Sequence, residues 1–115
     1  MTRSRRPKGE ERTSDAVPIQ DILGGLLRER SLADGLAVGR LASRWPSVVG
    51  DRLASETAPA RLEGGTLTVA VSSGPWGAQA KFLIEEIRKK ANETLGAPVV
   101  ARVQITVRED PRKPL

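Results

Sequence analysis

Apolar and polar residues alternate most regularly between residues 66 and 72, where Leu67, Val69 and Val71 fall on one side. A period of two residues is typical of a strand with one buried face. Gly64 and Gly65 precede this stretch, and the alternation resumes before them at residues 61–63. Because both glycines accept a positive φ, the pattern predicts a hairpin with a two-residue turn.

The period changes to that of a helix after Pro75. Apolar residues then recur every three or four positions, at Trp76, Ala80, Leu83, Ile84, Ile87, Ala91 and Leu95. This spacing gives one apolar stripe and predicts a helix over 75–95. Pro75 suits the first helical position, Ser73 or Gly74 the N-cap, and Gly96 the C-cap.

Two helices and a last strand complete the pattern. A first helix is expected from Pro18, with a stripe formed by Ile19, Ile22, Leu23, Leu26 and Leu27. A second helix is expected to start between Ser31 and Asp34 and to end or kink at Pro46. Residues 51–58 are expected to form another helical turn or an irregular segment that Pro59 stops. Residues 99–108 alternate again, which predicts a strand with Ala101, Val103, Ile105 and Val107 facing the core.

The expected order is helix, helix, strand, strand, helix, strand, which is an α+β fold. A crossover through the third helix makes the last strand parallel to residues 66–72, so that the helices cover one face of a three-stranded sheet. The other face would expose small and polar residues, namely Thr66, Thr68, Ala70, Arg102, Gln104 and Thr106. Residues 1–17 are expected to be a disordered basic tail, 18–107 the ordered domain and 108–115 a flexible tail.

Composition narrows the possible chemistry. The chain has 115 residues with neither His nor Cys, which removes the usual nitrogen and sulfur metal ligands, thiol nucleophiles and disulfides. No Walker-type phosphate loop and no catalytic constellation stands out, so we expect a protein without enzymatic activity or cofactor. No apolar run is long enough to span a membrane. We expect a cytoplasmic, nucleoid-associated monomer.

A net charge of +5 makes nucleic acid a candidate partner. The candidate phosphate contacts are Lys81, Arg88, Lys89 and Lys90 on the third helix, Arg102 on the last strand, Arg3, Arg5, Arg6 and Lys8 near the N-terminus, and Arg112 and Lys113 near the C-terminus. A solvated basic surface explains the same residues. Trp45 and Trp76 fit core positions, with partner binding as the alternative for Trp45 and base stacking for Trp76.

Four short motifs resemble the DciA family of bacterial replication proteins. They are Trp45-Pro46-Ser47-Val48-Val49-Gly50-Asp51-Arg52-Leu53-Ala54, Thr57-Ala58-Pro59-Ala60-Arg61-Leu62, Gly65-Thr66-Leu67-Thr68-Val69 and Ser72-Ser73-Gly74-Pro75-Trp76-Gly77. Each motif is short, but their order and spacing together are specific. The resemblance covers about residues 18–107.

The resemblance implies a small K-homology-like domain that binds the replicative helicase DnaB, assists its loading onto single-stranded DNA and also binds DNA directly. A general RNA-binding or nucleic-acid-binding module on a K-homology-like scaffold is the alternative. One feature departs from K-homology domains, whose Gly-x-x-Gly loop lies between two helices. Here the Gly-x-x-Gly sequence is Gly74-Pro75-Trp76-Gly77, between a strand and a helix. We interpret it as a turn and cap, with a nucleic-acid-binding loop as the alternative.

Overall fold

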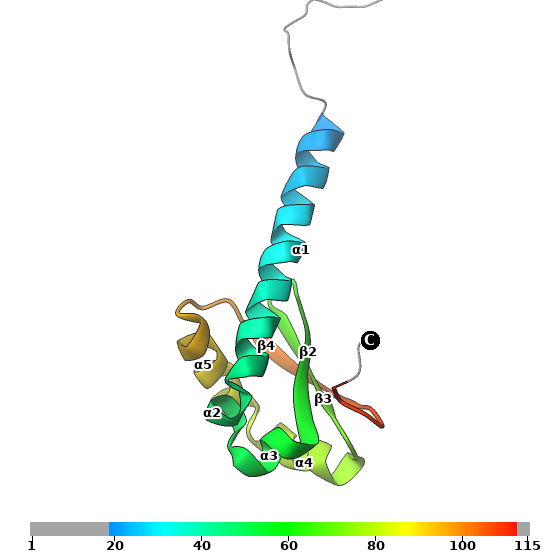
Figure 1. Cartoon of the computed structure of the whole chain (residues 1–115), viewed down its shortest axis with the longest axis vertical. Coiled ribbons are helices and arrows are strands. Elements are labelled where there is room, and N and C mark those ends of the chain that lie inside the picture. The colour runs from blue at the N-terminus through cyan, green and yellow to red at the C-terminus, as the bar shows by residue number, and fades with distance from the viewer. Residues whose placement is uncertain (1–18, 113–115) are drawn as a thin grey trace, which may run out of the picture. The chain divides into compact units, whose positions relative to one another are not determined.

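The computed structural model describes residues 19–112, which form helices and a three-stranded sheet (Figure 1). The elements are α1 (Ile19–Ser43), α2 (Trp45–Val49), α3 (Asp51–Glu56), β2 (Thr57–Glu63), β3 (Thr66–Val71), α4 (Gly74–Phe82), α5 (Ile84–Leu95) and β4 (Arg102–Val107). The chain divides into two compact units within α1, after Arg30, and the unit from Ser31 onward holds the sheet and helices α2–α5. The predictions for residues 1–17 and for Lys113 lie outside the described residues.

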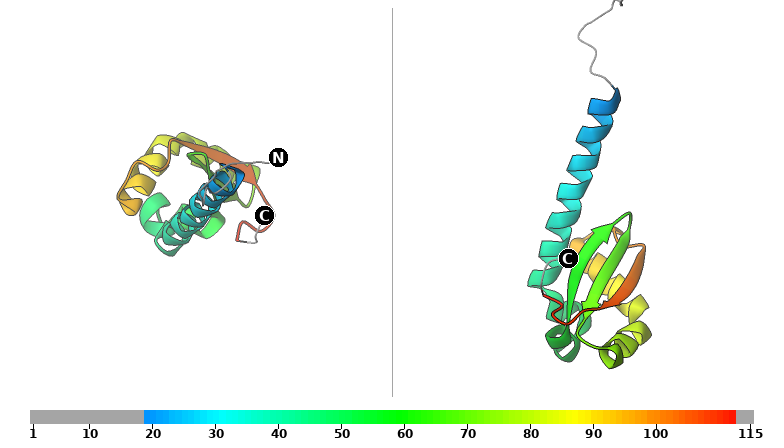
Figure 2. Two further views of the ribbon diagram at one scale, coloured as in Figure 1. Left: turned by 90° about the horizontal axis from the view of Figure 1, so that it is seen from above. Right: turned by 90° about the vertical axis from the view of Figure 1, so that its right-hand side faces the viewer.

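The sheet has the order β2-β3-β4, with β2 antiparallel and β4 parallel to the central strand (Figure 2). This arrangement confirms the predicted α+β class and the parallel last strand. Gly64 and Gly65 join β2 to β3 with φ values of 56° and 80°. Only residues without a Cβ adopt such values at little cost, so the two glycines set the hairpin.

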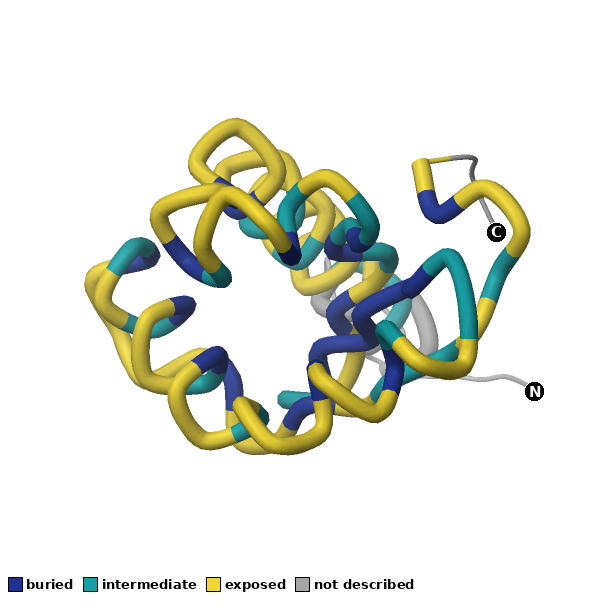
Figure 3. The backbone as a smooth tube through the Cα atoms, turned by 90° about the horizontal axis from the view of Figure 1, so that it is seen from below, coloured by how far each residue is buried: buried dark blue, intermediate teal, exposed yellow. Residues whose placement is uncertain are grey.

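The core lies between the sheet and the helices. Leu67, Val69 and Val71 are completely buried on one face of β3, and Ile87, Ala91 and Leu95 bury the inner stripe of α5. Along α2–α5, buried positions recur among exposed ones with the period of a helix (Figure 3). The alternation of β3 and the helical period of α5 therefore meet in one core, as the sequence predicts.

The helix boundaries differ from the prediction in two places. The expected break between Ser31 and Asp34 is wrong, because α1 continues to Ser43. Ser and Asp favour helix starts but do not interrupt a helix, as a proline would. The predicted helix over 75–95 is divided at Leu83, whose φ of −107° and ψ of 12° separate α4 from α5. Leu83 is consequently 37% exposed and not a core residue.

Strand β2 is longer than predicted, and Pro59 lies inside it. The Ser72 amide donates to the Glu56 carbonyl at 2.9 Å, so Glu56 and Ser72 form a hydrogen-bonded pair. Antiparallel pairs alternate, so Pro59 and its partner Val69 form a non-hydrogen-bonded pair and the missing N–H of Pro59 points away from β3. A proline is tolerated on an edge strand for this reason, and the expectation that Pro59 ends an element is wrong.

The last strand is shorter than predicted, since it begins at Arg102. The Asn92 side chain accepts from the Val100 amide at 2.8 Å and donates to the Val100 carbonyl at 3.0 Å, so Val100 is held by α5 and not by β3.

Val107, predicted to face the core, is exposed at the end of the strand. Thr68 and Ala70, predicted to be exposed, are buried because small side chains on the central strand lie between larger neighbours such as Arg61 and Gln104.

Candidate functional site

The basic residues predicted on the third helix are exposed or half-buried on α4 and α5. Arg88 does not offer a free guanidinium, because its Nη2 and Nε atoms donate to Glu85 Oε1 at 2.9 and 3.2 Å. This hydrogen bond and the Arg88 charge lower the pKa of the Glu85 carboxyl, and the same bond raises the pKa of Arg88. Lys81, Lys89 and Lys90 are the more accessible cations of this group.

The expected strip of cations lies on two flanks of α5. Lys90 lines a shallow depression of about 310 Å³ together with Leu83 and with residues 46–50, which include α2. Arg88 and Lys89 line a separate depression of about 480 Å³ that extends to residues 96–98. A single strand of nucleic acid would therefore have to cross α5 to reach all of these cations.

The remaining described candidates lie elsewhere. Arg102 is exposed on β4, on the sheet face opposite the core. Arg112 donates from Nη2 to the carbonyls of Ala54 and Ser55, both at 3.3 Å, and Pro111 beside it is buried. These bonds hold the chain at Arg112 close to the end of α3. Arg3, Arg5, Arg6 and Lys8, like Lys113, are outside the described residues.

The two tryptophans differ in their environment. Trp45 is buried, and its Nε1 donates to Thr57 Oγ1 at 2.9 Å, which confirms the core role favoured from the sequence. Trp76 is only half-buried and packs against the core.

The Gly74-x-x-Gly77 sequence forms the first turn of α4, where a Cβ on Gly77 would lie 3.3 Å from Val71 Cγ2. Gly77 therefore allows the close approach of α4 to the sheet.

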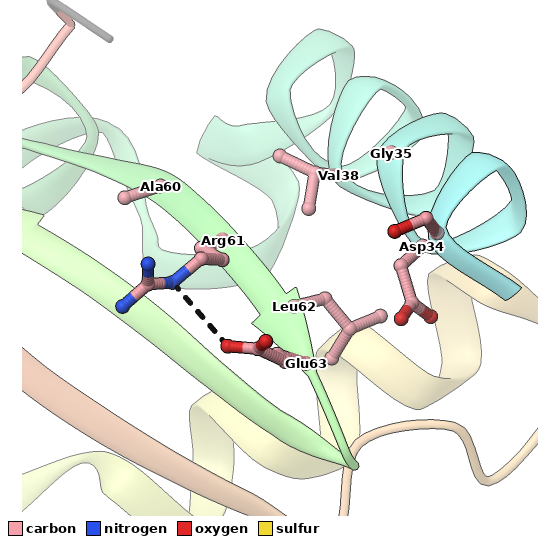
Figure 4. A pocket seen from close by; sticks show the side chains of 8 residues that line it. Asp34, Gly35, Val38, Ala60, Arg61, Leu62 and Glu63 are labelled. Carbon is pink, nitrogen blue, oxygen red and sulfur yellow. Dashed lines mark ion pairs between the residues drawn. The ribbon is translucent and has the colours of Figure 1, made fainter. Parts of the chain in front are cut away.

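Two depressions beside strand β2 were not predicted from the sequence. They share Ala60, and we call them together the α1–β2 groove. The first has a volume of about 310 Å³ and is lined by Ser31, Asp34, Gly35, Val38, Ala60, Arg61, Leu62 and Glu63 (Figure 4). The second has about 480 Å³ and is lined by Ala42, Trp45, Pro46, Ala54, Thr57, Ala58, Pro59, Ala60, Pro111 and Arg112.

Most of the α1 residues that line this groove are small. The lining positions 31, 35, 38 and 42 are Ser, Gly, Val and Ala, spaced by three or four residues along one helix face, and Asp34 lies beside them. An added Cβ on Gly35 would meet nothing within 4 Å. The i, i+3, i+4 spacing of small residues was visible in the sequence, but the partner element opposite them was not.

Charged residues line both depressions. Asp34, Arg61 and Glu63 line the first, where Glu63 Oε1 is 3.9 Å from Arg61 Nε (Figure 4). Both members of that pair are largely exposed, so it is weak. Arg112 lines the second, with its Nη2 donating to the carbonyls of Ala54 and Ser55. Within residues 19–112 no group of three or more His, Cys, Asp or Glu side chains is arranged to hold a metal ion, and no helix there has the length and hydropathy to cross a membrane.

Comparison of the sequence with known proteins identifies its family. The family model described as Dna[CI] antecedent, DciA, matches residues 18–105. A UPF0232 protein of Streptomyces avermitilis is 31% identical over 93 residues, which cover 79% of this chain and 51% of the relative. A UPF0232 protein of Mycobacterium leprae is 28% identical over 92 residues, which cover 80% of this chain and 49% of the relative. The chain thus spans about half the length of these relatives, and by the extent of the family match it belongs to the DciA family.

Proposed function

We propose that this chain is a non-enzymatic DNA-replication factor that binds the replicative helicase DnaB and assists its loading onto single-stranded DNA. The proposal rests on the DciA family match, which extends over residues 18–105. The match includes all of β2 and β3 and most of β4. DnaB binding is the role that the family resemblance implies, and we propose it for this chain.

Direct DNA binding is the second part of the proposal. Lys81, Lys89 and Lys90 are exposed, and within the described residues no ion pair or hydrogen bond is found for their ammonium groups. Lysines of this kind bind phosphates without reading sequence, and their contribution decreases as salt rises. Arg102 and the basic residues of the two ends of the chain would extend these contacts.

A lysine variant tests the DNA part. The affinity of the chain for a fluorescein-labelled oligothymidylate is measured by anisotropy at several salt concentrations. Replacing Lys81, Lys89 and Lys90 with Gln should reduce the slope of log affinity against log salt by about 0.7 for each lost contact. The control variant replaces the exposed Arg44 and Arg52 with Gln, on elements that carry none of the proposed contacts. Equal slopes for the two variants would refute binding through α4 and α5.

The helicase part is tested by loading. DnaB and the chain are mixed with a forked DNA duplex, and unwinding is followed with time. We expect the chain to increase the unwinding rate without hydrolysing ATP itself. Preferential binding of structured RNA over forked DNA, together with no effect on unwinding, would instead support a general RNA-binding module.

A further inference from the structure

We propose that Phe82 stacks on a base of single-stranded nucleic acid, while lysines near it bind the flanking phosphates. The inference rests on the proposed DNA binding and deepens it, because it names a single strand as the ligand and assigns a contact to the bases. Three observations support it: the exposure of Phe82, the engagement of the other aromatic rings by the fold, and the cations near the end of α4.

Phe82 lies at the junction of two helices. It is the last residue of α4, and the helical path is interrupted directly after it, at Leu83. Phe82 is 90% exposed, more than any other large apolar residue of the described chain. A residue with this exposure buries almost no area against the fold, so its ring is open to a ligand.

The other two aromatic residues of the chain are engaged by the fold. Trp45 is buried and bonded to Thr57 Oγ1, and Trp76 is half-buried and packs against the core. The chain has one phenylalanine and no tyrosine, so Phe82 carries its one freely accessible aromatic ring. Proteins stack the bases of single strands on such rings, because every base has a π face.

Cations near Phe82 come from both helices. Lys81 precedes Phe82 in the last turn of α4, and Lys90 lies on α5. Lys90 lines the depression of about 310 Å³ to which Leu83, the residue after Phe82, also belongs. Both lysines are exposed. Ammonium groups from two different elements can therefore bind the phosphates before and after a stacked base.

The acidic residues of this region are compatible with a base. Glu85 Oε1 already accepts two hydrogen bonds from Arg88. Glu86 lines the same depression as Lys90. A carboxylate repels phosphates but accepts hydrogen bonds from the amino groups of bases. An uncharged base is thus the part of a strand that fits beside Glu86.

A single strand fits this surface better than a duplex or a protein does. The bases of a duplex are stacked on one another, so a ring cannot reach their faces unless a base is first extruded. A protein interface has an apolar core of several residues. Among the exposed large apolar residues of the described chain, only Leu83, which is 37% exposed, lies beside Phe82 at the junction of α4 and α5.

Variants of Phe82 test the stacking with two ligands. One is fluorescein-labelled oligothymidylate, and the other is an abasic oligomer of equal length, which carries the same phosphates without bases. Phe82→Ala should weaken oligothymidylate binding by about fivefold to a hundredfold and leave abasic binding within about twofold. The salt slope should not change, because no phosphate contact is lost.

Three further variants separate a ring face from apolar area. Phe82→Tyr keeps an aromatic ring and should bind like the parent chain, whereas Phe82→Leu is apolar without a ring and should bind like Phe82→Ala. Leu36→Ala is the matched control, since it removes an apolar side chain that is 63% exposed on α1. All of these variants should retain the thermal midpoint of the parent chain in circular dichroism, because exposed side chains contribute little packing.

The Phe82 ring provides a readout that requires no substitution. Because the chain contains one phenylalanine, a chain labelled with ring-¹³C phenylalanine reports on Phe82 alone in NMR spectra. A base stacked on the ring should shift the ring proton resonances upfield through its ring current. The abasic oligomer, which offers phosphates alone, should leave these resonances in place.

The stacking is refuted if Phe82→Ala binds oligothymidylate as the parent chain does, if Phe82→Leu binds like Phe82→Tyr, or if saturating oligothymidylate leaves the ring resonances unchanged. It is also refuted if Phe82→Ala prevents complex formation with DnaB and leaves oligothymidylate binding intact, since the ring would then contact a protein.

The proposed function fails in ways that can be told apart from these. If the lysine variant changes the salt slope while Phe82→Ala keeps the parent affinity, the stacking alone is refuted and DNA binding stands. A chain that does not bind oligothymidylate refutes both. A chain that stacks bases on Phe82 and yet does not assist DnaB refutes only the helicase part of the proposed function.

Discussion

The buried indole of Trp45 donates from Nε1 to Thr57 Oγ1 at 2.9 Å, and the same hydroxyl donates to the Leu53 carbonyl at 2.6 Å. The Thr57 side chain thus links the start of α2 and the middle of α3 to the first residue of β2. Both Trp45 and Thr57 are almost inaccessible to solvent, so water cannot replace either bond.

Replacing Thr57 with Val keeps the shape of the side chain and removes its hydroxyl. The Trp45 Nε1–H is then buried without an acceptor, which should lower the free energy of unfolding by about 1–3 kcal/mol. Urea denaturation measures the change, with Thr66→Val on the partly exposed start of β3 as the control. If the unpaired donor is the cause, adding Trp45→Phe to Thr57→Val should cost less than the sum of the two single changes. Full additivity would contradict the proposed link.

Asn92 should be required for the path of the chain into β4. Its side chain holds both backbone groups of Val100, so Asn92→Ala should destabilise the fold by about 1–3 kcal/mol and speed exchange of the Val100 amide. Ala is a better helix former than Asn, which makes any loss attributable to the two hydrogen bonds. Glu93→Ala, at an exposed position of the same helix, is the control. An unchanged Val100 exchange rate in Asn92→Ala would contradict this role.

Gly77 should resist enlargement. A Cβ there already lies 3.3 Å from Val71 Cγ2 and 3.7 Å from Ile105 Cγ2, so Gly77→Val overfills the contact between α4 and the sheet. We expect a loss of about 1–3 kcal/mol in the free energy of unfolding. Gly39→Val, placed in open space on α1, should be close to neutral by the same urea measurement. Equal effects at the two glycines would show that helix propensity, and not packing, determines the result.

Glu85 should restrain Arg88 from binding phosphates. Removing the carboxylate charge by Glu85→Gln weakens the pair with Arg88, whose bonds to Oε1 are 2.9 and 3.2 Å long. The affinity for oligothymidylate at low salt should rise, with a salt slope steeper by up to about 0.7 for one additional phosphate contact. Glu93→Gln removes the same charge from α5 without releasing Arg88. If both variants raise affinity equally with no change in slope, net charge alone is responsible.

The sequence predicted the elements whose pattern is local. The alternation from Thr66 to Val71, the glycine turn and the parallel last strand are all present. The break at Leu83 could not be predicted, because the apolar stripe of the sequence continues through it. The prediction for Pro59 was wrong for a related reason. A strand tolerates a proline at the edge of a sheet, and which strand lies at the edge depends on the arrangement of the whole sheet.

The candidate site was predicted less completely than the fold. Charge identified Lys81, Arg88, Lys89 and Lys90 as exposed cations, but one-dimensional spacing did not reveal the pairing of Arg88 with Glu85 or the division of the group between two flanks of α5. The α1–β2 groove gave no signal of its own, because its two sides are not adjacent in the sequence. Val38 and Leu62, for example, are separated by more than twenty positions.

The central claim is that this chain binds the replicative helicase. The most direct measurement is complex formation between purified DnaB and the 115-residue chain, followed by analytical ultracentrifugation at micromolar concentration in the absence of DNA. We expect a complex that sediments faster than DnaB alone and contains both proteins. Two independently sedimenting species under these conditions, with both proteins folded, would contradict it.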